Sequence, residues 1–435
     1  MRFLMKQQYV NLLLLLSFTS FGQSGVNISA IRVNQQRIES RIFELANFGK
    51  DDDGKGYRVA YTQGDIDGRA WFINLMKQAG LDVSIDNAGN IIGKRIGKDP
   101  SLKPIAFGSH IDMVPDGGNY DGCVGSISAL EVIEVLNEHQ VITKHPLQVI
   151  IFSNEEGGTY GSMALAGLLN NDVLKNISQS GYTIADGISA IGGHPDGLAA
   201  VKRKKEDITS FLELHIEQGG ILDKENIQIG VVEGIVGIID WEVTILGFAN
   251  HAGTTPMDLR QDAMLAAAKL VVAIHDIITT EKGRQVENVG KIEAYPGAYN
   301  VIPGKVIMSL EIRDLSYQKI LDLFKKIENK AMAIAASTGT KISFQQQNAI
   351  KPALTTKSIQ DKIVQSAESL GLSYKHMQSG AGHDSQNMAL ICPMGMIFVP
   401  SKGGISHSPK EFTKPSDMAN GANVLLQTIL ALDKE

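Results

Sequence analysis

The sequence contains very little cysteine, because Cys123 and Cys392 are the only two among 435 residues. Two cysteines cannot form the disulfide framework that holds many small secreted domains together. Cys123 lies within a stretch rich in glycine and polar residues, which is a candidate site. We therefore predict a packed free thiol at Cys123 and not one half of a disulfide bridge.

An excess of basic residues is also missing, since the formal net charge is −6. This balance gives no indication of a nucleic-acid partner. Hydrophobic residues make up 43% and charged residues 20% of the chain, which is typical of a soluble globular protein. A chain of 435 residues is too long for one small domain, so we expect two domains or one domain with a large insertion.

Long apolar runs are scarce, and the clearest one lies at the N-terminus. Arg2 and Lys6 precede the apolar run Val10–Phe21, which is too short to span a bilayer and is followed by small and polar residues. We predict a cleaved signal peptide over residues 1–23 and export to the periplasm or the extracellular space. The alternative is an N-terminal membrane anchor. We expect no other segment to be long and apolar enough to cross a membrane, and therefore no membrane contact after cleavage.

Strands and helices alternate along most of the chain. "PIAFGSHID" and "LQVIIFSNEE" are typical of short buried strands, and "VGSISALEVIEVLNEHQ" between them is typical of a helix. This order predicts an α/β catalytic domain with a central mixed sheet flanked by helices, formed by residues 26–222 and 348–435. Residues 223–347 follow another order: strand, helix, strand, strand, helix, strand. We interpret them as an inserted α+β domain with two helices on a four-stranded sheet.

Histidines and carboxylates recur where predicted buried strands end. In α/β sheets, ligands and catalytic residues gather just beyond the carboxyl ends of the strands. Each residue alone is weak evidence, but imidazole and carboxylate groups together suit zinc and similar divalent ions. The candidates are His110 with Asp112, Asp121, Glu155 with Glu156, His215 and His407.

The adjacent pair Glu155 and Glu156 needs an explanation, because two close carboxylates disfavour each other's ionisation. A metal ion bound to one glutamate would neutralise its charge and leave the other free to act as a base on a metal-bound water. The alternative is the start of a solvated loop. Asp112, two residues after His110, could be the carboxylate that orients a ligating imidazole, or simply a polar loop residue.

Seven segments together resemble the amidase branch of the M20 metallopeptidase clan. This branch includes N-carbamoyl-L-amino-acid hydrolases, β-ureidopropionase-like enzymes and allantoate amidohydrolases. The resemblance runs from about residue 30 to the C-terminus. The segments are "GSHIDMVPDGGNYDGCVG", "NEEGG", "ELHIEQG", "GFANHAGTTPMDLRQDA", "NVIPG", "SGAGHDSQNMA" and "GMIFVPSKGGISHSPKE".

The resemblance implies a site for two divalent ions, with Zn²⁺ or Mn²⁺ favoured and Co²⁺ or Ni²⁺ possible. One ion would be held by His110, Asp121 and His215. The other would be held by Asp121, Glu156 and His407, with Asp121 bridging the two ions. Glu155 would be the general base, and Asp112 would orient His110.

The resemblance also implies a carboxylate substrate and a homodimer formed through the inserted domain, which would act as a lid. His251 would reach the site from the partner subunit and stabilise the oxyanion. Without the resemblance we would interpret His251 as a turn or capping residue and Arg313 as part of an ion pair with Asp314 or Glu311. Arg260 and Asp262 would brace the lid helix. The substrate-binding residues would be Gln218, Asn300, Arg313, Gly382 and His383.

Several functions remain open on this evidence. The leading hypothesis is a metal-dependent amidohydrolase that cleaves a linear amide C–N bond of N-carbamoyl-L-amino acids or related ureido acids. Allantoate is an alternative substrate, and a peptidase or aminoacylase is a further alternative. A hypothesis of another class is an exported binding protein without turnover. Two departures from the family leave the substrate open: "GTY" follows the paired glutamates where an arginine and an aromatic are common, and a signal peptide is unusual.

Overall fold

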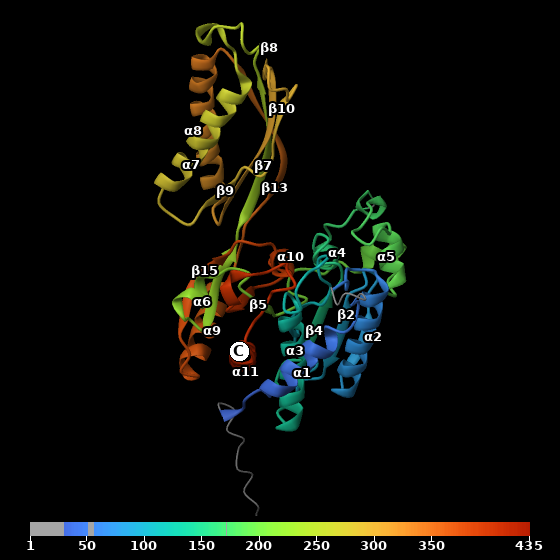
Figure 1. Cartoon of the computed structure of the whole chain (residues 1–435). Coiled ribbons are helices and arrows are strands. Elements are labelled where there is room, and N and C mark those ends of the chain that lie inside the picture. The colour runs from blue at the N-terminus through green and yellow to red at the C-terminus, as the bar shows by residue number, and fades with distance from the viewer. Residues whose placement is uncertain (1–29, 51–55, 171) are drawn as a thin grey trace, which may run out of the picture.

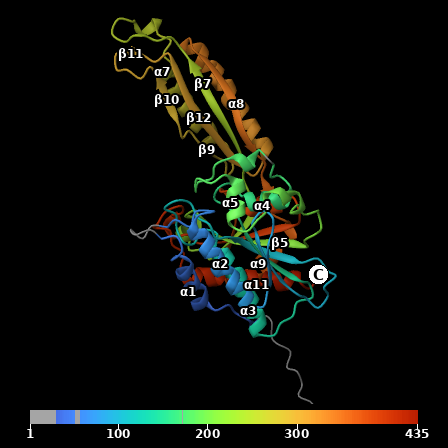
Figure 2. The ribbon, with the colours of Figure 1, turned by 90° about the vertical axis from the view of Figure 1, so that its right-hand side faces the viewer.

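The computed structural model describes residues 30–50, 56–170 and 172–435. The predicted signal peptide, residues 1–23, lies outside the described residues. Figures 1 and 2 both show a larger part built on one sheet and a smaller part that projects away from it. Both cysteines are buried and free, which confirms the prediction for Cys123.

The larger part contains a nine-stranded mixed sheet. Its central four strands, in the order β4, β3, β5 and β16, are parallel, whereas β1, β2, β6 and β14 join it in antiparallel pairs. A further strand, β15, pairs with β6 in parallel. The strands are β1 (Asp82–Ile85), β2 (Ile91–Arg95), β3 (Ile105–His110), β4 (Leu147–Phe152), β5 (Ser210–Ile216), β6 (Ile229–Ile235), β14 (Ala353–Leu354), β15 (Tyr374–Ser379) and β16 (Met394–Val399).

Helices cover both faces of this sheet, so the predicted α/β class is confirmed. One hydrophobic cluster joins the sheet to α1 (Gln35–Leu45), α2 (Gln63–Gln78), α3 (Cys123–Glu138), α9 (Lys357–Ser369) and α11 (Pro415–Leu432). A second cluster, on the opposite face, includes residues of α4 (Tyr160–Ala166) and α10 (Asp384–Met388). Shorter helices are α5 (Ile184–Ala190) and α6 (Ile221–Glu225). The helix α3 is buried continuously from Cys123 to Ile133, because it lies between the sheet and the outer helices α1 and α11.

The smaller part contains a second sheet with two helices, as predicted for the insertion. Its main strands follow the order β10, β12, β7, β13, and a short fifth strand, β9, pairs with β12 and corrects the predicted number of four. Alternating burial along β7 and β12 leaves one face of the sheet to be covered by α7 and α8 (Figure 1). The elements are β7 (Gly237–Leu246), α7 (Ala263–Thr280), β9 (Val286–Asn288), β10 (Ile292–Tyr295), β12 (Lys305–Asp314), α8 (Tyr317–Thr338) and β13 (Lys341–Ile350).

The far end of the smaller part has a two-stranded antiparallel sheet of β8 (Asn250–His251) and β11 (Val301–Ile302). Figures 1 and 2 place this small sheet, which we call the lid tip, at the end remote from the larger sheet. The described chain passes between the two parts near β7 and β13. The boundaries predicted for the inserted domain, residues 223 and 347, need a correction, because β6 (Ile229–Ile235) still pairs within the larger sheet and β13 continues to Ile350 in the smaller one.

The expectation that no segment beyond the N-terminal run is long and apolar enough to cross a membrane was wrong. By length and composition alone, α7 could cross a membrane, since its 18 residues have a mean hydropathy of 1.6. Its apolar residues at helical spacing, such as Ala266, Leu270 and Ile274, are buried in the core of the smaller part. A helix that packs on both a sheet and a neighbouring helix acquires this composition without a membrane.

Candidate metal centre

The predicted ligands converge because they follow neighbouring parallel strands. His110 is the last residue of β3, His215 lies one residue before the end of β5, and Glu155 and Glu156 come shortly after β4. His407 lies in the loop after β16, which pairs in parallel with β5. The carboxyl ends of parallel strands meet at one edge of a sheet, which is the usual position of sites in such folds.

The first group of possible ligands consists of His110, Asp121 and His215, whose ligand atoms all lie within 4.8 Å of one another. The Nε2 atoms of His215 and His110 lie 3.1 and 3.6 Å from Oδ1 of Asp121. The other ring nitrogen, Nδ1, faces a backbone carbonyl in both histidines, at 3.1 Å in His110 and 2.9 Å in His215. A carbonyl can only accept, so Nδ1 carries a proton in both rings and Nε2 is the nitrogen that faces the group. Nε2 of His215 also lies 3.2 Å from the backbone N–H of Gly122.

The second group consists of Asp121, Glu156 and His407, again with ligand atoms within 4.8 Å. Nε2 of His407 lies 3.4 Å from Oδ2 of Asp121 and 3.4 Å from Oε2 of Glu156. The two oxygens of Asp121 therefore face different groups, Oδ1 toward the buried histidines and Oδ2 toward His407. This orientation suits a carboxylate that bridges two ions.

The electrostatics of this cluster fit divalent cations. Burial and, to a smaller extent, the neighbouring Asp121 raise the pKa of Glu156 to about 7. Burial also opposes ionisation of Asp121, but the surrounding histidines hold its pKa well below the usual range. Nε2 of His110 and Oε1 of Glu156 are buried and have no hydrogen-bond partner. Buried, unpaired nitrogen and carboxylate oxygen atoms that face one small space are what zinc and similar ions require.

Glu155 belongs to neither group, yet its side chain reaches the same space. Its Oε2 lies 3.6 Å from Nε2 of His110, and the side chain is 9% exposed. Burial raises the pKa of Glu155 well above its ordinary value, and the carboxylates of Asp384 and Glu156 add to this effect. A carboxylate beside the ligands that is not itself grouped with them has the position expected of a base.

Asp112 has a different contact from the one we expected. Its carboxylate oxygen is 3.8 Å from Nδ1 of His110, whereas its backbone carbonyl lies at 3.1 Å and is the partner that orients the ring. The carboxylate instead accepts the backbone N–H groups of Glu155, at 3.3 Å, and Glu156, at 3.1 Å. Asp112 thus fixes His110 through its main chain and the paired glutamates through its side chain.

Strained backbone conformations gather around the cluster. Asn154, Gln218 and His407 adopt positive φ angles of 49°, 57° and 51°, which are uncommon for residues with side chains. Gly122, at φ 63°, is packed so closely against His110 that an added Cβ would lie 2.3 Å from Nε2 of that ring. The turn after Asp121 therefore needs glycine at this position.

Two of the predicted substrate-binding residues lie beside the metal centre. Gln218 donates from Nε2 to Oδ2 of Asp121 at 2.6 Å, and its Oε1 is buried without a partner. The ring of His383 packs edge-on against His215, with centroids 4.4 Å apart, and its Nε2 contacts Oγ of Ser379 at 2.8 Å. Burial and the neighbouring His215 hold the pKa of His383 well below its ordinary value, so it is neutral.

His383 is also part of a competing group of possible ligands, with Glu213 and His215. One carboxylate oxygen of Glu213 already accepts a hydrogen bond from Oγ of Ser109 at 2.7 Å, and the other accepts one from Oγ of Ser385 at 2.6 Å. Because its oxygens are occupied in this way, we favour the two groups that share Asp121.

Arg313 lies where the smaller part meets the larger one. Its Nε donates to Glu311 at 2.6 Å, which is the plain ion pair considered from the sequence. Its Nη1 donates to the carbonyl of Gly380 at 2.7 Å, in the loop that continues to the exposed Gly382 and the buried His383. The guanidinium therefore stands at the edge of this loop, and its role toward a substrate stays a prediction.

His251 and Asn300 are not brought to the metal centre within one chain. Both are exposed at the lid tip, where His251 pairs with Val301 (Figure 1). Asp262 caps α7 by accepting the N–H groups of Met264 and Leu265, as predicted for a brace of this helix. Arg260 instead holds the turn after His251, because it donates to the carbonyls of Ala252 and Thr255.

Sequence reasoning missed two residues that hold the centre together. Ser406 and Glu411 contact the segment of Asp121 through their side chains. The only signal in the sequence was their position on either side of His407 in "SHSPKE". A serine and a glutamate in a loop carry no specific pattern, so their contacts became visible only in the fold.

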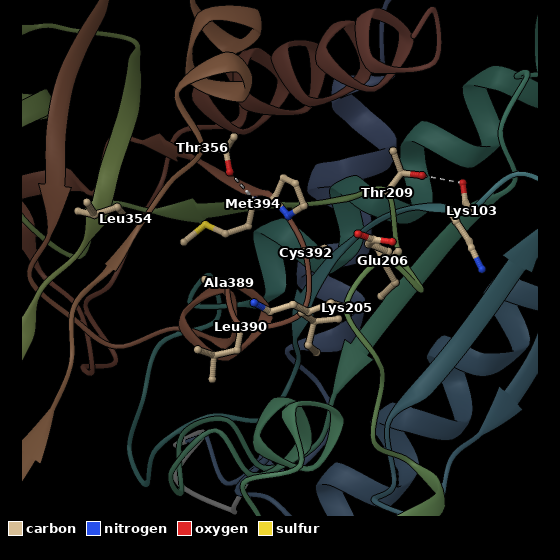
Figure 3. A pocket seen from close by; sticks show the side chains of 13 residues that line it. Lys103, Lys205, Glu206, Thr209, Leu354, Thr356, Ala389, Leu390, Cys392 and Met394 are labelled. Atoms are coloured by element: carbon tan, nitrogen blue, oxygen red, sulfur yellow. Dashed lines mark hydrogen bonds between the residues drawn. The ribbon is translucent and has the colours of Figure 1, made fainter.

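A hollow of about 570 Å³ lies at the opposite edge of the large sheet (Figure 3). It is near the amino ends of β5 and β16, and its lining includes Cys392 and Met394. Two of its polar groups are used within the protein: Oγ1 of Thr209 donates to the carbonyl of Lys103, and Oγ1 of Thr356 accepts the N–H of Met394. Its lining contains none of the predicted site residues.

Comparisons with known proteins identify the family of the chain. A family model described as peptidase family M20/M25/M40 matches residues 106–431. The chain is 36% identical over 405 residues to the N-carbamoyl-L-amino acid amidohydrolase of Geobacillus stearothermophilus, covering 92% of this chain and 99% of that protein. It is 39% identical over 426 residues to the ureidoglycolate hydrolase of Arabidopsis thaliana, covering 94% and 90%.

A solved structure is similar throughout. The amidase of the hydantoinase/carbamoylase family from Burkholderia multivorans superposes with a TM-score of 0.87 at 33% identity, and the match covers 93% of this chain and 99% of that one. The family match and these relatives define a metal-dependent hydrolase, and the two candidate ligand groups that share Asp121 suit such an enzyme. The chain belongs to the M20/M25/M40 peptidase family.

Proposed function

We propose that this protein is a metal-dependent amidohydrolase that cleaves the linear amide C–N bond of an N-carbamoyl-L-amino acid or a related ureido acid. The observation that carries the proposal is the pair of ligand groups sharing Asp121, with the buried Glu155 beside them and in neither group. Several relatives in the same family act on such compounds according to their names, which supports the substrate class.

The chemistry follows from the positions of the side chains. Two divalent ions in these groups would lower the pKa of a shared water and polarise the scissile carbonyl. Glu155 accepts the proton of the attacking water and passes it to the leaving nitrogen. Asp112 keeps Glu155 in place by accepting its backbone N–H at 3.3 Å. Hydrolysis of an N-carbamoyl amino acid then yields the amino acid, ammonia and carbon dioxide.

The carboxylate of the substrate needs a cationic partner near this centre. Arg313 can form two parallel hydrogen bonds with a carboxylate, and it already lies at the edge of the loop with Gly382 and His383. Its present bond to the Gly380 carbonyl shows that this loop is within its reach. Gln218, with an unpartnered Oε1 beside Asp121, can position a donor group of the substrate.

We further propose a homodimer in which His251 and Asn300 enter the partner's site, because both are exposed at the lid tip, away from the metal centre of their own chain (Figure 1). Co-expression of Glu155→Gln with His251→Ala tests this directly. A mixed dimer contains one site with Glu155 from one chain and His251 from the other, so roughly one quarter of wild-type activity returns. Mixtures that stay inactive despite proven mixed dimers contradict the proposal.

The substrate is tested by ammonia release from metal-stripped protein resupplied with Zn²⁺ or Mn²⁺. The panel contains N-carbamoyl-L-amino acids, allantoate and ureidoglycolate, together with N-acyl amino acids and dipeptides followed by amine release. Metal-dependent ammonia release from one ureido compound supports the proposal. Turnover of only acyl or peptide substrates favours the peptidase or aminoacylase alternative. Metal binding without turnover of any compound favours the exported binding protein.

The metal and the location are proposals of the same kind. The ligand set of three histidines and two carboxylates suits Zn²⁺ or Mn²⁺, and Co²⁺ or Ni²⁺ could replace them. We propose export because the first 23 residues have the layout of a signal peptide. Cell fractionation and N-terminal sequencing of the mature protein test this, and an intact N-terminus in the cytoplasm contradicts it.

A further inference from the structure

Glu411 is a buried carboxylate that belongs to neither ligand group but joins the segments that carry them. It is only 5% exposed. Its Oε1 accepts the backbone N–H groups of Tyr120, at 2.8 Å, and Asp121, at 3.0 Å. Its Oε2 accepts Oγ of Ser406 at 2.8 Å. One side chain thus connects the turn of the bridging aspartate to the residue directly before His407.

This connection is held tightly from both sides. The backbone N–H of Glu411 donates to the carbonyl of Ser408 at 3.0 Å, which closes the turn that follows His407. On the other side, a Cβ added to Gly118 would lie 2.3 Å from Cβ and from Oε1 of Glu411. Glycine at position 118 therefore lets the carboxylate approach the turn of Asp121, and the close packing leaves Glu411 little freedom to move.

Ser406 joins Glu411 to a predicted metal ligand, because its hydroxyl contacts both Glu411 and Asp121. Its Oγ lies 2.8 Å from Oε2 of Glu411 and 3.0 Å from Oδ2 of Asp121. A serine hydroxyl has one proton, so it can donate to only one of these two carboxylates at a time. The carboxylate that does not receive this proton depends on other partners. Oδ2 of Asp121 also accepts a hydrogen bond from Nε2 of Gln218 at 2.6 Å, and it is the oxygen that faces His407 in the second group.

We propose that Glu411 is a positioning residue for the second ion, acting through Ser406 and the amides of Tyr120 and Asp121. It fixes Oδ2 of Asp121 relative to His407. These two ligands lie far apart in the sequence, and the side chain of His407 is half exposed. A rigid carboxylate is needed here because His407 has 50% of its side chain exposed and adopts a positive φ. The inference rests on the metal centre of the proposed function, but not on the identity of the substrate.

The ligand groups differ in how much they depend on this link. His110 and His215 are held by backbone carbonyls at Nδ1 and are almost fully buried. His407 has no such carbonyl partner among its described hydrogen bonds. Loss of the link should therefore weaken the ion of the second group more than the ion of the first.

Titration calorimetry of the metal-stripped full chain with Mn²⁺ tests the inference without any measurement of activity. We expect the wild type to bind two ions. Glu411→Gln and Ser406→Ala should each weaken one ion by about 10–100-fold, as is typical when a partner of a ligand is removed, and leave the other within a few fold. Ser406→Thr keeps the hydroxyl and should restore most of the affinity.

A matched control separates positioning from general stabilisation. Glu131 is also a buried glutamate that accepts a backbone N–H, from Asn34 at 2.7 Å, and it pairs with Arg37 far from the ligands. Glu131→Gln should bind both ions like the wild type, even if its melting temperature falls. The double variant of Ser406→Ala and Glu411→Gln should lose no more affinity than the stronger single variant, because both remove the same link.

Each contrary result has a distinct meaning. Wild-type affinity of both ions in Glu411→Gln and Ser406→Ala overturns the inference while the proposed metal centre stands. Equal weakening of both ions, in proportion to a lower melting temperature and matched by Glu131→Gln, also overturns it, because Glu411 would then be only structural. A wild type that does not bind two ions refutes the metal centre itself, and the inference with it.

Discussion

Replacing Glu155 by glutamine removes the base and should leave the metal centre in place. The two side chains have nearly the same size, so no cavity forms at this buried position. The backbone N–H of residue 155 still donates to Asp112, because that bond does not involve the side chain. Glu155 is in neither ligand group, so both ions should remain bound.

The side chains around Glu155 indicate how large the loss of activity in Glu155→Gln should be. A positioned general base typically contributes about 10²–10⁴-fold, which corresponds to about 3–5 kcal/mol in the activation free energy. The neighbouring carboxylates cannot easily replace it, since Glu156 belongs to the second ligand group and Asp112 accepts two backbone N–H groups. We therefore expect a fall in kcat at the upper end, about 10³–10⁴-fold, with little change in KM.

The assay combines steady-state ammonia release at saturating metal with the metal content of the purified variant. Glu155→Asp is the matched control, because it keeps a carboxylate but withdraws it by one methylene and should lose less activity. A loss of less than tenfold in Glu155→Gln, with two ions bound, means that another group takes the proton. Loss of an ion together with activity means that Glu155 is a ligand and not the base.

Three further predictions test other parts of the reasoning. Arg313→Ala should lower kcat/KM for carboxylate substrates by about 10–100-fold, from the loss of charged hydrogen bonds, and for neutral amides only slightly; equal losses on both would exclude the carboxylate contact. Gly122→Ala places a Cβ 2.3 Å from Nε2 of His110 at a positive φ, so it should cost at least about 1–3 kcal/mol in urea unfolding and weaken metal binding; an unchanged midpoint would show that the turn can relax. Burial raises the pKa of Asp65 to about 6 in the folded protein. The stability that comes from the protonated side chain is therefore fully present below the unfolded pKa and is lost as the pH rises through about 6. Asp65→Asn keeps an oxygen for the N–H of Tyr61 and should abolish a loss of about 2.4 kcal/mol in the free energy of unfolding between pH 4 and 7.5, measured by urea unfolding at both values; parallel pH curves for variant and wild type would contradict the assignment.

Much of this fold and site could be predicted because the relevant signals are local. The apolar runs before His110, Glu155 and His215 predicted buried strands, and parallel strands bring their ends to one edge. The alternation along β7 and β12 predicted a sheet with one covered face. The resemblance added the grouping of the ligands, which the structure brings within 4.8 Å of one another.

The sequence by itself thus determined the elements, the fold class and the residue types available for metal chemistry, because burial and periodicity act between near neighbours along the chain. Only the tertiary structure decided which partner each side chain took. Asp112 contacts the paired glutamates with its carboxylate, Arg260 holds the turn of the lid tip, and Glu411 reaches Asp121 across the chain. These choices depend on which distant segments meet at hydrogen-bond distance, and a short-range pattern carries no information about that.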